Sequence, residues 1–94
     1  MIIYQKLATH SISVIVYFIE KQGFPQNAIN YEARLYEFSE GLQNFPEKYQ
    51  ICRFEKYMKK GYRCAPFENY IFVYRIQVKD IIVINVVHSK RLNI

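Results

Sequence analysis

Two apolar runs in the C-terminal half of the chain place the strongest constraint on its fold. Residues 70–78 and 81–88 are its most β-branched and aromatic stretches, and only Lys79 and Asp80 separate them. Val, Ile, Tyr and Phe favour strands because they pack well on a pleated, half-buried surface. A two-residue polar connection between two such runs is typical of an antiparallel hairpin. Because Lys-Asp is not a favoured turn pair, the turn can extend back into the residues before Lys79.

Side chains of a strand alternate between the two faces of a sheet, which assigns each run two faces. In the first run, one predicted face carries Tyr70, Phe72, Tyr74 and Ile76, and the other carries Ile71, Val73, Arg75 and Gln77. In the second run, one predicted face carries Ile82, Ile84, Val86 and His88, and the other carries Ile81, Val83, Asn85 and Val87. Both faces of the second run are apolar near its centre, which predicts an interior strand.

Two more strands are predicted around this hairpin. Residues 62–67 form the first strand of a three-stranded antiparallel meander, and residues 2–7 form a strand at the N-terminus. Arg75 lies on an interior strand of this meander. We expect it to pair with a carboxylate, Glu68 or Asp80, or to extend its stem across the sheet face.

Two amphipathic helices are predicted between the N-terminal strand and the meander. The first is capped by Thr9, His10 or Ser11 and ends at Gly23. Its core-facing residues recur at helical spacing and are Ile12, Ile15, Val16 and Ile19, with Val14 and Phe18 widening the apolar face. Because the run is β-branched, a strand over residues 11–18 is the alternative.

The second predicted helix starts at Pro25, because proline suits the first turn of a helix. Its apolar stripe continues over about five turns and consists of Ala28, Tyr31, Leu35, Phe38, Leu42 and Phe45, and Pro46 ends it. We expect Gly41 to mark a close contact with the first helix. The order of elements predicts an α+β fold in one domain, residues 1–94, with an N-terminal strand, an antiparallel helix hairpin and the meander. Both helices then cover one face of a four-stranded sheet.

Positive charge is concentrated in the C-terminal half of the chain. Residues 1–47 hold three basic and five acidic residues, a net charge of −2, whereas residues 48–94 hold ten basic and three acidic residues, a net charge of +7. Within residues 47–61, basic residues alternate with aromatic ones. This pattern suits a nucleic-acid surface, with cations for phosphates and rings for unpaired bases. The alternative is a solvated connector whose aromatic side chains anchor it to the core.

The two cysteines, Cys52 and Cys64, show no metal-ligand or redox-motif spacing. We expect free thiols, no metal, no cofactor and a reducing cytoplasm. The apolar stretch 12–19 is too short to span a bilayer and has no cleavage site, so no membrane segment or signal peptide is expected. The sequence also contains no phosphate-binding loop, no Ser/His/Asp set and no paired-carboxylate motif.

Several short motifs resemble the RelE/ParE superfamily of bacterial toxins from type II toxin–antitoxin modules. The junction formed by Gly23, Phe24, Pro25 and Ala28 resembles its G-x-P-x-x-A helix turn, and residues 42–47 (LQNFPE) resemble its L-x-x-F-P-E helix end. A third pattern is similar to the ParE-like R-x-x-P, Y-x-x-x-Y-R and V-x-H-x-x-R series and comprises Arg63, Pro66, Tyr70, residues 73–75 (VYR) and residues 87–91 (VHSKR). The resemblance extends from about residue 6 to residue 92.

The resemblance implies a toxin that a cognate antitoxin holds inactive, often in an oligomer, by wrapping it with a segment that folds on binding. Ribosome-dependent RNases of the superfamily carry an Arg directly after the Tyr that matches Tyr70, where this chain has Ile71. An isoleucine cannot supply the charge that stabilises a phosphate in the transition state. The sequence is therefore closer to the ParE-like, plasmid-stabilisation branch, whose target is DNA gyrase.

His88 is the sharpest candidate for chemistry, because its ordinary pKa suits proton transfer near neutrality. Together with Arg91 and Arg63 it forms the candidate catalytic set of the alternative function, a ribosome-dependent mRNA endonuclease. In the other interpretation, His88 makes a hydrogen bond at the strand end and the nearby cations face solvent or the antitoxin. The candidate partner- or nucleic-acid-binding residues are Arg53, Lys56, Lys59, Lys60, Arg63, Lys90 and Arg91. A toxin whose activity has decayed is a third possibility.

Overall fold

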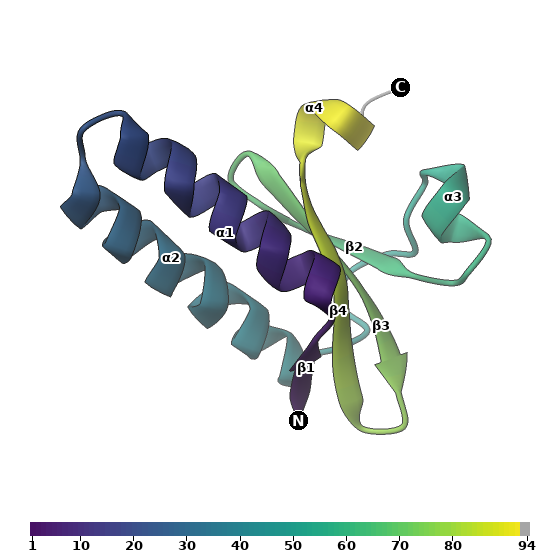
Figure 1. Cartoon of the computed structure of the whole chain (residues 1–94). Helices are drawn as coiled ribbons and strands as arrows, with labels where there is room; N and C mark the ends of the chain where they lie inside the picture. Colours follow the sequence, from purple (N-terminus) through teal and green to yellow (C-terminus); the bar gives the residue numbers. More distant parts are fainter. Residues whose placement is uncertain (93–94) are drawn as a thin grey trace.

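The two apolar runs form the centre of a four-stranded mixed sheet. In the computed structural model, which describes residues 1–92, β3 (Tyr70–Gln77) pairs antiparallel with β4 (Asp80–His88). β2 (Arg63–Phe67) lies antiparallel to β3, and β1 (Ile2–Tyr4) lies parallel to β4 on its other side. The resulting strand order is β1-β4-β3-β2 (Figure 1). This confirms the predicted α+β fold and the interior position of the second run.

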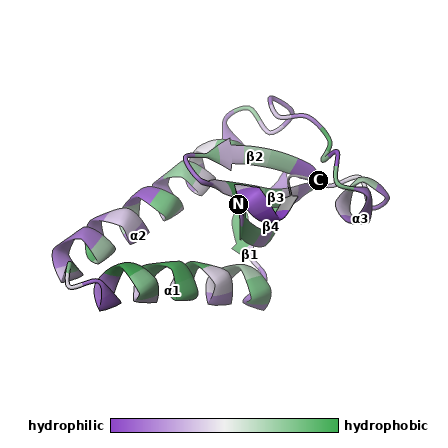
Figure 2. Ribbon diagram, turned by 90° about the horizontal axis from the view of Figure 1, so that it is seen from above, coloured by the Kyte–Doolittle hydropathy of each residue, from purple (hydrophilic) through white to green (hydrophobic). Residues whose placement is uncertain are grey.

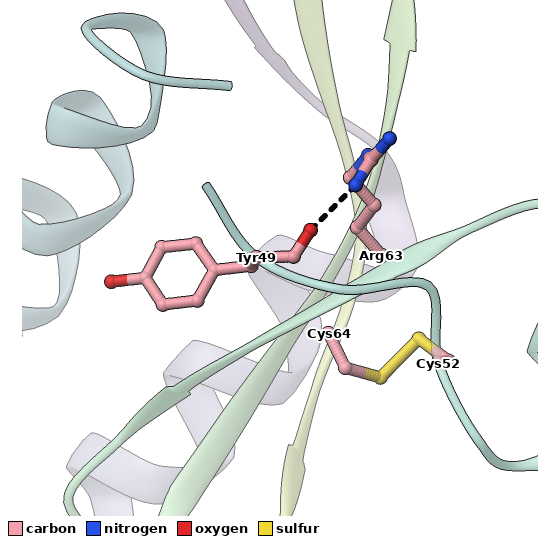
Figure 3. The surroundings of a disulfide bond; sticks show 4 residues. All are labelled: Tyr49, Cys52, Arg63 and Cys64. Atoms are coloured by element: carbon pink, nitrogen blue, oxygen red, sulfur yellow. Dashed lines mark hydrogen bonds between the residues drawn. A yellow bond between two sulfur atoms is a disulfide. The ribbon is translucent and has the colours of Figure 1, made fainter. Parts of the chain in front are cut away.

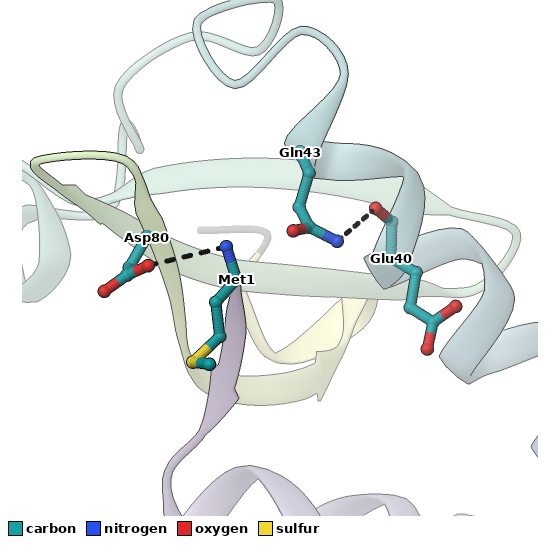
Figure 4. Close-up of polar contacts among 4 residues, drawn as sticks. All are labelled: Met1, Glu40, Gln43 and Asp80. Atoms are coloured by element: carbon teal, nitrogen blue, oxygen red, sulfur yellow. Dashed lines mark hydrogen bonds and ion pairs between the residues drawn. The ribbon is translucent and has the colours of Figure 1, made fainter.

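The turn between β3 and β4 lies one residue earlier than the polar pair in the sequence. Val78 adopts a φ of 58°, and Asp80 already belongs to β4. The carboxylate of Asp80 lies 3.4 Å from the amino group of Met1 (Figure 4). The amide of Ile81 donates a hydrogen bond of 2.9 Å to the Met1 carbonyl. These contacts hold β1 against the start of β4.

A β-bulge interrupts the pairing of β3 with β4. Val73 pairs with Asn85 and the next residue, Tyr74, pairs with Val83, so Ile84 is an extra residue on β4. A bulge of this kind shifts the alternation of the residues that follow it by one position. The faces predicted from simple alternation therefore hold only as far as Ile84.

Beyond the bulge, the predicted faces of β4 are wrong. Val86 was expected to lie beside Ile82 and Ile84, but it packs into the core under the helices. Ile82 and Ile84 contribute to a second core on the other face of the sheet. His88 pairs with Tyr70, and their ring centroids are 5.3 Å apart. The bulge thus turns the side chain of Val86 toward the face of the sheet that the helices cover.

Helix α1 (Lys6–Lys21) begins earlier than its predicted caps. Its N-cap is Gln5, with no side-chain hydrogen bond, so none of the three predicted residues caps it. The amide of Gln5 donates to the Val83 carbonyl at 3.0 Å, and the chain leaves the sheet there. β1 is for this reason shorter than predicted. The helical interpretation of the first apolar segment is confirmed, and Gly23, with a φ of 89°, follows its end as expected.

Helix α2 (Pro25–Glu40) ends before the predicted boundary. A 3₁₀ turn, Gly41–Gln43, continues it, and the side-chain amide of Gln43 donates to the Glu40 carbonyl at 3.2 Å (Figure 4). Phe45 is 72% exposed, so the end of the predicted stripe does not belong to the core. A Cβ added to Gly41 would meet no atom within 4 Å, so the expected close contact with α1 is absent.

Both faces of the sheet are buried, each by a different part of the chain. α1 and α2 lie side by side on one face, and Figure 2 shows the more hydrophobic character of α1. Residues 50–62, which include the short helix α3 (Glu55–Met58), cover the other face. The rings of Phe54, Tyr57 and Tyr62 pack into this second core. The connector interpretation of this segment is therefore correct for its rings.

Cys52 and Cys64 form a disulfide, so the prediction of two free thiols is wrong. The segment after Tyr49 runs back along β2, where the Cys52 amide donates to the Tyr62 carbonyl at 2.8 Å. The two Cα atoms are 4.9 Å apart, although 12 positions separate them in the sequence (Figure 3). The bond fastens the segment that carries α3 to β2.

Removal of the disulfide should destabilise the protein. Cross-linking a loop of this length removes conformational entropy from the unfolded chain, a contribution of about 3 kcal/mol. We expect the Cys52→Ser, Cys64→Ser variant to lose about this much unfolding free energy in urea denaturation under non-reducing conditions. Wild-type protein with a reductant serves as the control and should unfold at a similar midpoint. If the oxidised wild type were no more stable than the double serine variant and the reduced wild type, this would contradict a stabilising disulfide.

Alkaline pH should destabilise the protein through Tyr74. This side chain is fully buried and donates a 2.6 Å hydrogen bond to the Pro46 carbonyl, and burial raises its pKa from 10.0 to about 12. Since the folded pKa is the higher one, its contribution is complete below pH 10 and is lost as the pH rises toward 12. The loss amounts to about 2–3 kcal/mol.

The comparison is between Tyr74→Phe and the wild type. The variant should lose about 1 kcal/mol at neutral pH with its hydrogen bond, and its stability should fall less steeply between about pH 10 and 12. Tyr17→Phe, at a residue that is 53% exposed, is the control and should follow the wild-type profile. Identical pH profiles for Tyr74→Phe and the wild type would contradict this assignment.

Candidate functional site

A groove lies between α1 and the end of the central strand β4. It has a volume of about 410 Å³, and Arg91 of the short helix α4 (Ser89–Leu92) is part of its lining. Its lining combines apolar side chains with a few polar and cationic ones, namely His10, Ser11, Val14, Ile15, Phe18, Tyr70, Val86, Val87, His88 and Arg91. We call this surface the α1–β4 groove.

Two features of the sequence build the α1–β4 groove. Ser11, Val14 and Phe18 recur at spacings of 3 and 4 and so lie along one side of α1. The bulge at Ile84 turns Val86 toward the same space. Val14 is 39% exposed and Phe18 is 61% exposed, which leaves apolar surface open to solvent. The groove therefore has an apolar wall that the protein itself does not cover.

A partly buried polar contact fixes α1 over the bulge. The Ser11 hydroxyl donates to Oδ1 of Asn85 at 2.6 Å, and the same oxygen accepts the Val86 amide at 2.8 Å. Asn85 is one of two buried polar residues among those described, and its amide oxygen is satisfied twice. Such a satisfied pair sets the position of a helix more specifically than apolar packing does.

His88 stands at the rim of the groove with its ring edge-on to Tyr70. Its Nδ1 accepts a 3.2 Å hydrogen bond from the Lys90 amide, which agrees with a role at the strand end. Burial raises the pKa of the Tyr70 hydroxyl above its ordinary value. Arg91, exposed on α4, lines the same groove. The structure thus brings His88 and Arg91 to one site.

Arg63 does not join them. Its guanidinium donates a 2.6 Å hydrogen bond to the Tyr49 carbonyl and holds the loop beside β2 (Figure 3). Arg63 pairs with Tyr74, whereas His88 pairs with Tyr70, four positions away along β3. At about 3.3 Å per residue, this offset alone is about 13 Å. The three candidate catalytic residues therefore do not form one cluster.

Ile71, the residue where the RNase branch has arginine, lies on the opposite face of the sheet. It pairs with Val87 on one side and with Pro66 on the other, and it is half-buried in the second core. A shallow pocket of about 260 Å³ beside it is lined by Arg53 and by both cysteines. No catalytic charge is supplied from position 71.

The remaining predicted binding residues divide into two groups. Lys90 and Arg91 are exposed on α4 beside the groove, whereas Arg53, Lys56, Lys59 and Lys60 are exposed around α3 on the other face of the sheet. Lys59 pairs with Glu55 at 3.3 Å. The predicted binding residues therefore form two separate positively charged surfaces, one on α4 and one around α3.

The predicted ion pair of Arg75 is wrong for the part of the chain that is described. Glu68 pairs with Arg34 of α2, and Asp80 pairs with the amino group of Met1. Both carboxylates are thus engaged by groups that come from the N-terminal half. These pairs depend on how the helices and the N-terminus lie against the sheet, which the local sequence around Arg75 does not encode.

Comparison with known proteins decides the family. The family model described as the ParE toxin of the type II toxin-antitoxin system, parDE, matches residues 2–93. The chain belongs to the ParE toxin family. A solved structure entitled "Chromosomal ParDE TA system from P. aeruginosa" is similar to it, with a TM-score of 0.79 and 14% sequence identity, covering 93% of this chain and 92% of the other. At this identity the similarity shows the fold. A search of curated protein sequences found no match.

Three residues that line the α1–β4 groove were not among the predicted site residues. His10, Val14 and Phe18 line the groove from α1 but were expected only to start the helix or to widen its apolar face. The signal was an apolar face wider than one helix needs for packing. Within residues 1–92 of this ParE-family chain, no group of three or more His, Cys, Asp or Glu is placed to hold a metal ion. Its described helices are also too short or too polar to cross a membrane.

Proposed function

We propose that this ParE-family chain is a toxin that inhibits DNA gyrase by binding it in the cytoplasm, and that a cognate antitoxin neutralises it. The observation that supports a binding toxin is the position of Ile71 and Arg63. Ile71 is part of an apolar core, and the Arg63 guanidinium is engaged by the Tyr49 carbonyl. RNA cleavage needs positive charge fixed where the phosphate becomes more negative. Neither Ile71 nor Arg63 supplies a positive charge beside His88.

The second candidate function is cleavage of mRNA on the ribosome. One observation favours it, because His88 and Arg91 line the same groove and offer a titratable imidazole beside a cation. Because Arg63 lies elsewhere, His88 and Arg91 are only two of the three predicted catalytic residues. The ribosome itself would have to provide further charge.

Purified toxin should inhibit negative supercoiling of a relaxed plasmid by gyrase, and its induction in cells should cause DNA breaks and an SOS response. Because inhibition by binding needs no general acid, the His88→Ala, Arg91→Ala variant should keep most of its toxicity. Rapid loss of mRNA with intact DNA, abolished in this variant, would establish the nuclease instead. A wild type without any toxicity would indicate decayed activity.

The α1–β4 groove is the site that we propose for the antitoxin. Its apolar wall suits the apolar side of an amphipathic segment, and Arg91 with two histidines stands at its rim. Within residues 1–92, no Asp or Glu lines the groove. An acidic segment that folds as it binds fits both properties. We further propose that the complex with the antitoxin is an oligomer.

Charged substitutions in the groove should impair neutralisation. In the Val14→Glu, Phe18→Glu variant, the apolar wall is lost and an acidic segment is repelled, so antitoxin affinity should fall at least about tenfold. The matched control is Phe24→Glu, Ile29→Glu, since these residues are 54% and 60% exposed and lie outside the groove. Affinity is measured by calorimetry, and rescue of growth by co-expression gives a second readout. Equal losses in both variants would reject the groove as the site.

A further inference from the structure

The segment that covers the second face of the sheet carries a dense positive charge. Residues 53–60 contain four basic residues and one acidic residue. Arg53, Lys56, Lys59 and Lys60 are all exposed, and the one ion pair that Glu55 makes within residues 1–92 is with Lys59. We call residues 53–60 the basic segment. In Figure 1 its helix, α3, projects from the molecule on the side away from α1 and α2.

The rings of this region are buried or half-buried, which leaves little open ring face for stacking on bases. Tyr57 is 6% exposed, and Phe54 and Tyr62 pack against the same core. The ammonium groups of Lys56 and Lys60 lie over the rings of Tyr57 and Tyr62, at 5.3 and 5.9 Å. Binding of single strands depends on exposed aromatic platforms. The basic segment therefore offers cations for phosphates without a platform for unpaired bases.

The same surface is poor in the apolar groups that protein interfaces use. Met58, at 48% exposure, is the one exposed large apolar side chain within residues 53–60. Protein interfaces place an apolar, water-excluding centre inside a polar rim. A surface of cations without such a centre matches the phosphate backbone of a duplex, where charge neutralisation and counterion release supply the affinity.

The basic segment is also fixed in position before any partner binds. At its start, the Cys52 amide donates to the Tyr62 carbonyl at 2.8 Å, and the Tyr62 amide in turn donates to the Tyr57 carbonyl at 3.1 Å. At its end, Gly61 adopts a φ of 72°, where its amide reaches the Met58 carbonyl at 2.9 Å. A segment whose backbone is already ordered loses less conformational entropy on binding than a flexible one.

We propose that the basic segment binds the phosphate backbone of duplex DNA. This inference rests on the proposed function, because gyrase holds the duplex on which the toxin would lie. The basic segment and the α1–β4 groove belong to opposite faces of the sheet. DNA and an antitoxin in the groove therefore occupy separate surfaces of the toxin.

The test measures binding to a fluorescent duplex of about 20 base pairs by anisotropy over a range of salt concentrations. The variant Arg53→Gln, Lys56→Gln, Lys60→Gln removes three cations from the basic segment. The control, Lys6→Gln, Lys21→Gln, Lys79→Gln, removes the same charge from other exposed positions. We expect the first variant to bind at least about tenfold more weakly and its log–log salt slope to be smaller by about 2–3. The control should stay within about twofold of the wild type.

Four results would overturn the proposal. The first would be a wild type that does not bind the duplex at low salt, and the second a control that loses as much affinity as the variant. The third would be tighter binding of single-stranded DNA of the same sequence than of the duplex. The fourth would be stronger competition by poly-glutamate than by duplex DNA at equal charge, which would assign the surface to an acidic protein.

A supercoiling assay on the same samples separates this inference from the proposed function. Gyrase inhibition without binding to duplex DNA would retain the function and reject the DNA site. Binding that depends on the basic segment, without gyrase inhibition, would retain the DNA site and reject gyrase as the target.

Discussion

The pairing of β3 with β4 is the interaction on which the rest of the structure depends. β4 lies between β1 and β3, and its side chains enter two cores, one on each face of the sheet. The helix hairpin needs one of these apolar surfaces, and residues 50–62 need the other. Because neither layer is large enough to form a core alone, both are stable only when the central strands are paired. The two candidate binding surfaces are consequences of this double coverage.

Hydrophobic periodicity predicted most of the fold, because the periodicity of each segment depends on that segment alone. The two helices and the meander follow from spacings of 3–4 and of 2 within single segments. The bulge at Ile84 does not, because it is a relation between two strands and leaves no mark in the alternation of apolar residues on β4. The disulfide was missed for a similar reason. Cys52 and Cys64 meet only because an irregular segment returns along β2.

In the candidate site, too, features of a single segment could be predicted, whereas contacts between distant segments could not. His88 and Arg91 are three positions apart in the sequence, and their common position on the groove rim could be predicted. Arg63 was included because it belongs to a motif, but a motif does not say which atoms its guanidinium reaches. In the structure that partner is the carbonyl of Tyr49. The contribution of Val14 and Phe18 required knowledge of where α1 crosses the end of β4.

The position of β1 has a consequence for the order in which the molecule can be completed. Ile2, Ile3 and Tyr4 pair with Ile81, Ile82 and Val83, so β1 pairs with residues that are synthesised 79 positions later. Contacts between segments this distant in sequence form late, because a long chain has to close before they add stability. During translation, α1 and α2 can form as a hairpin, but the central strand is still inside the ribosome. The α1–β4 groove is therefore complete only after β4 has left the ribosome and paired with β3.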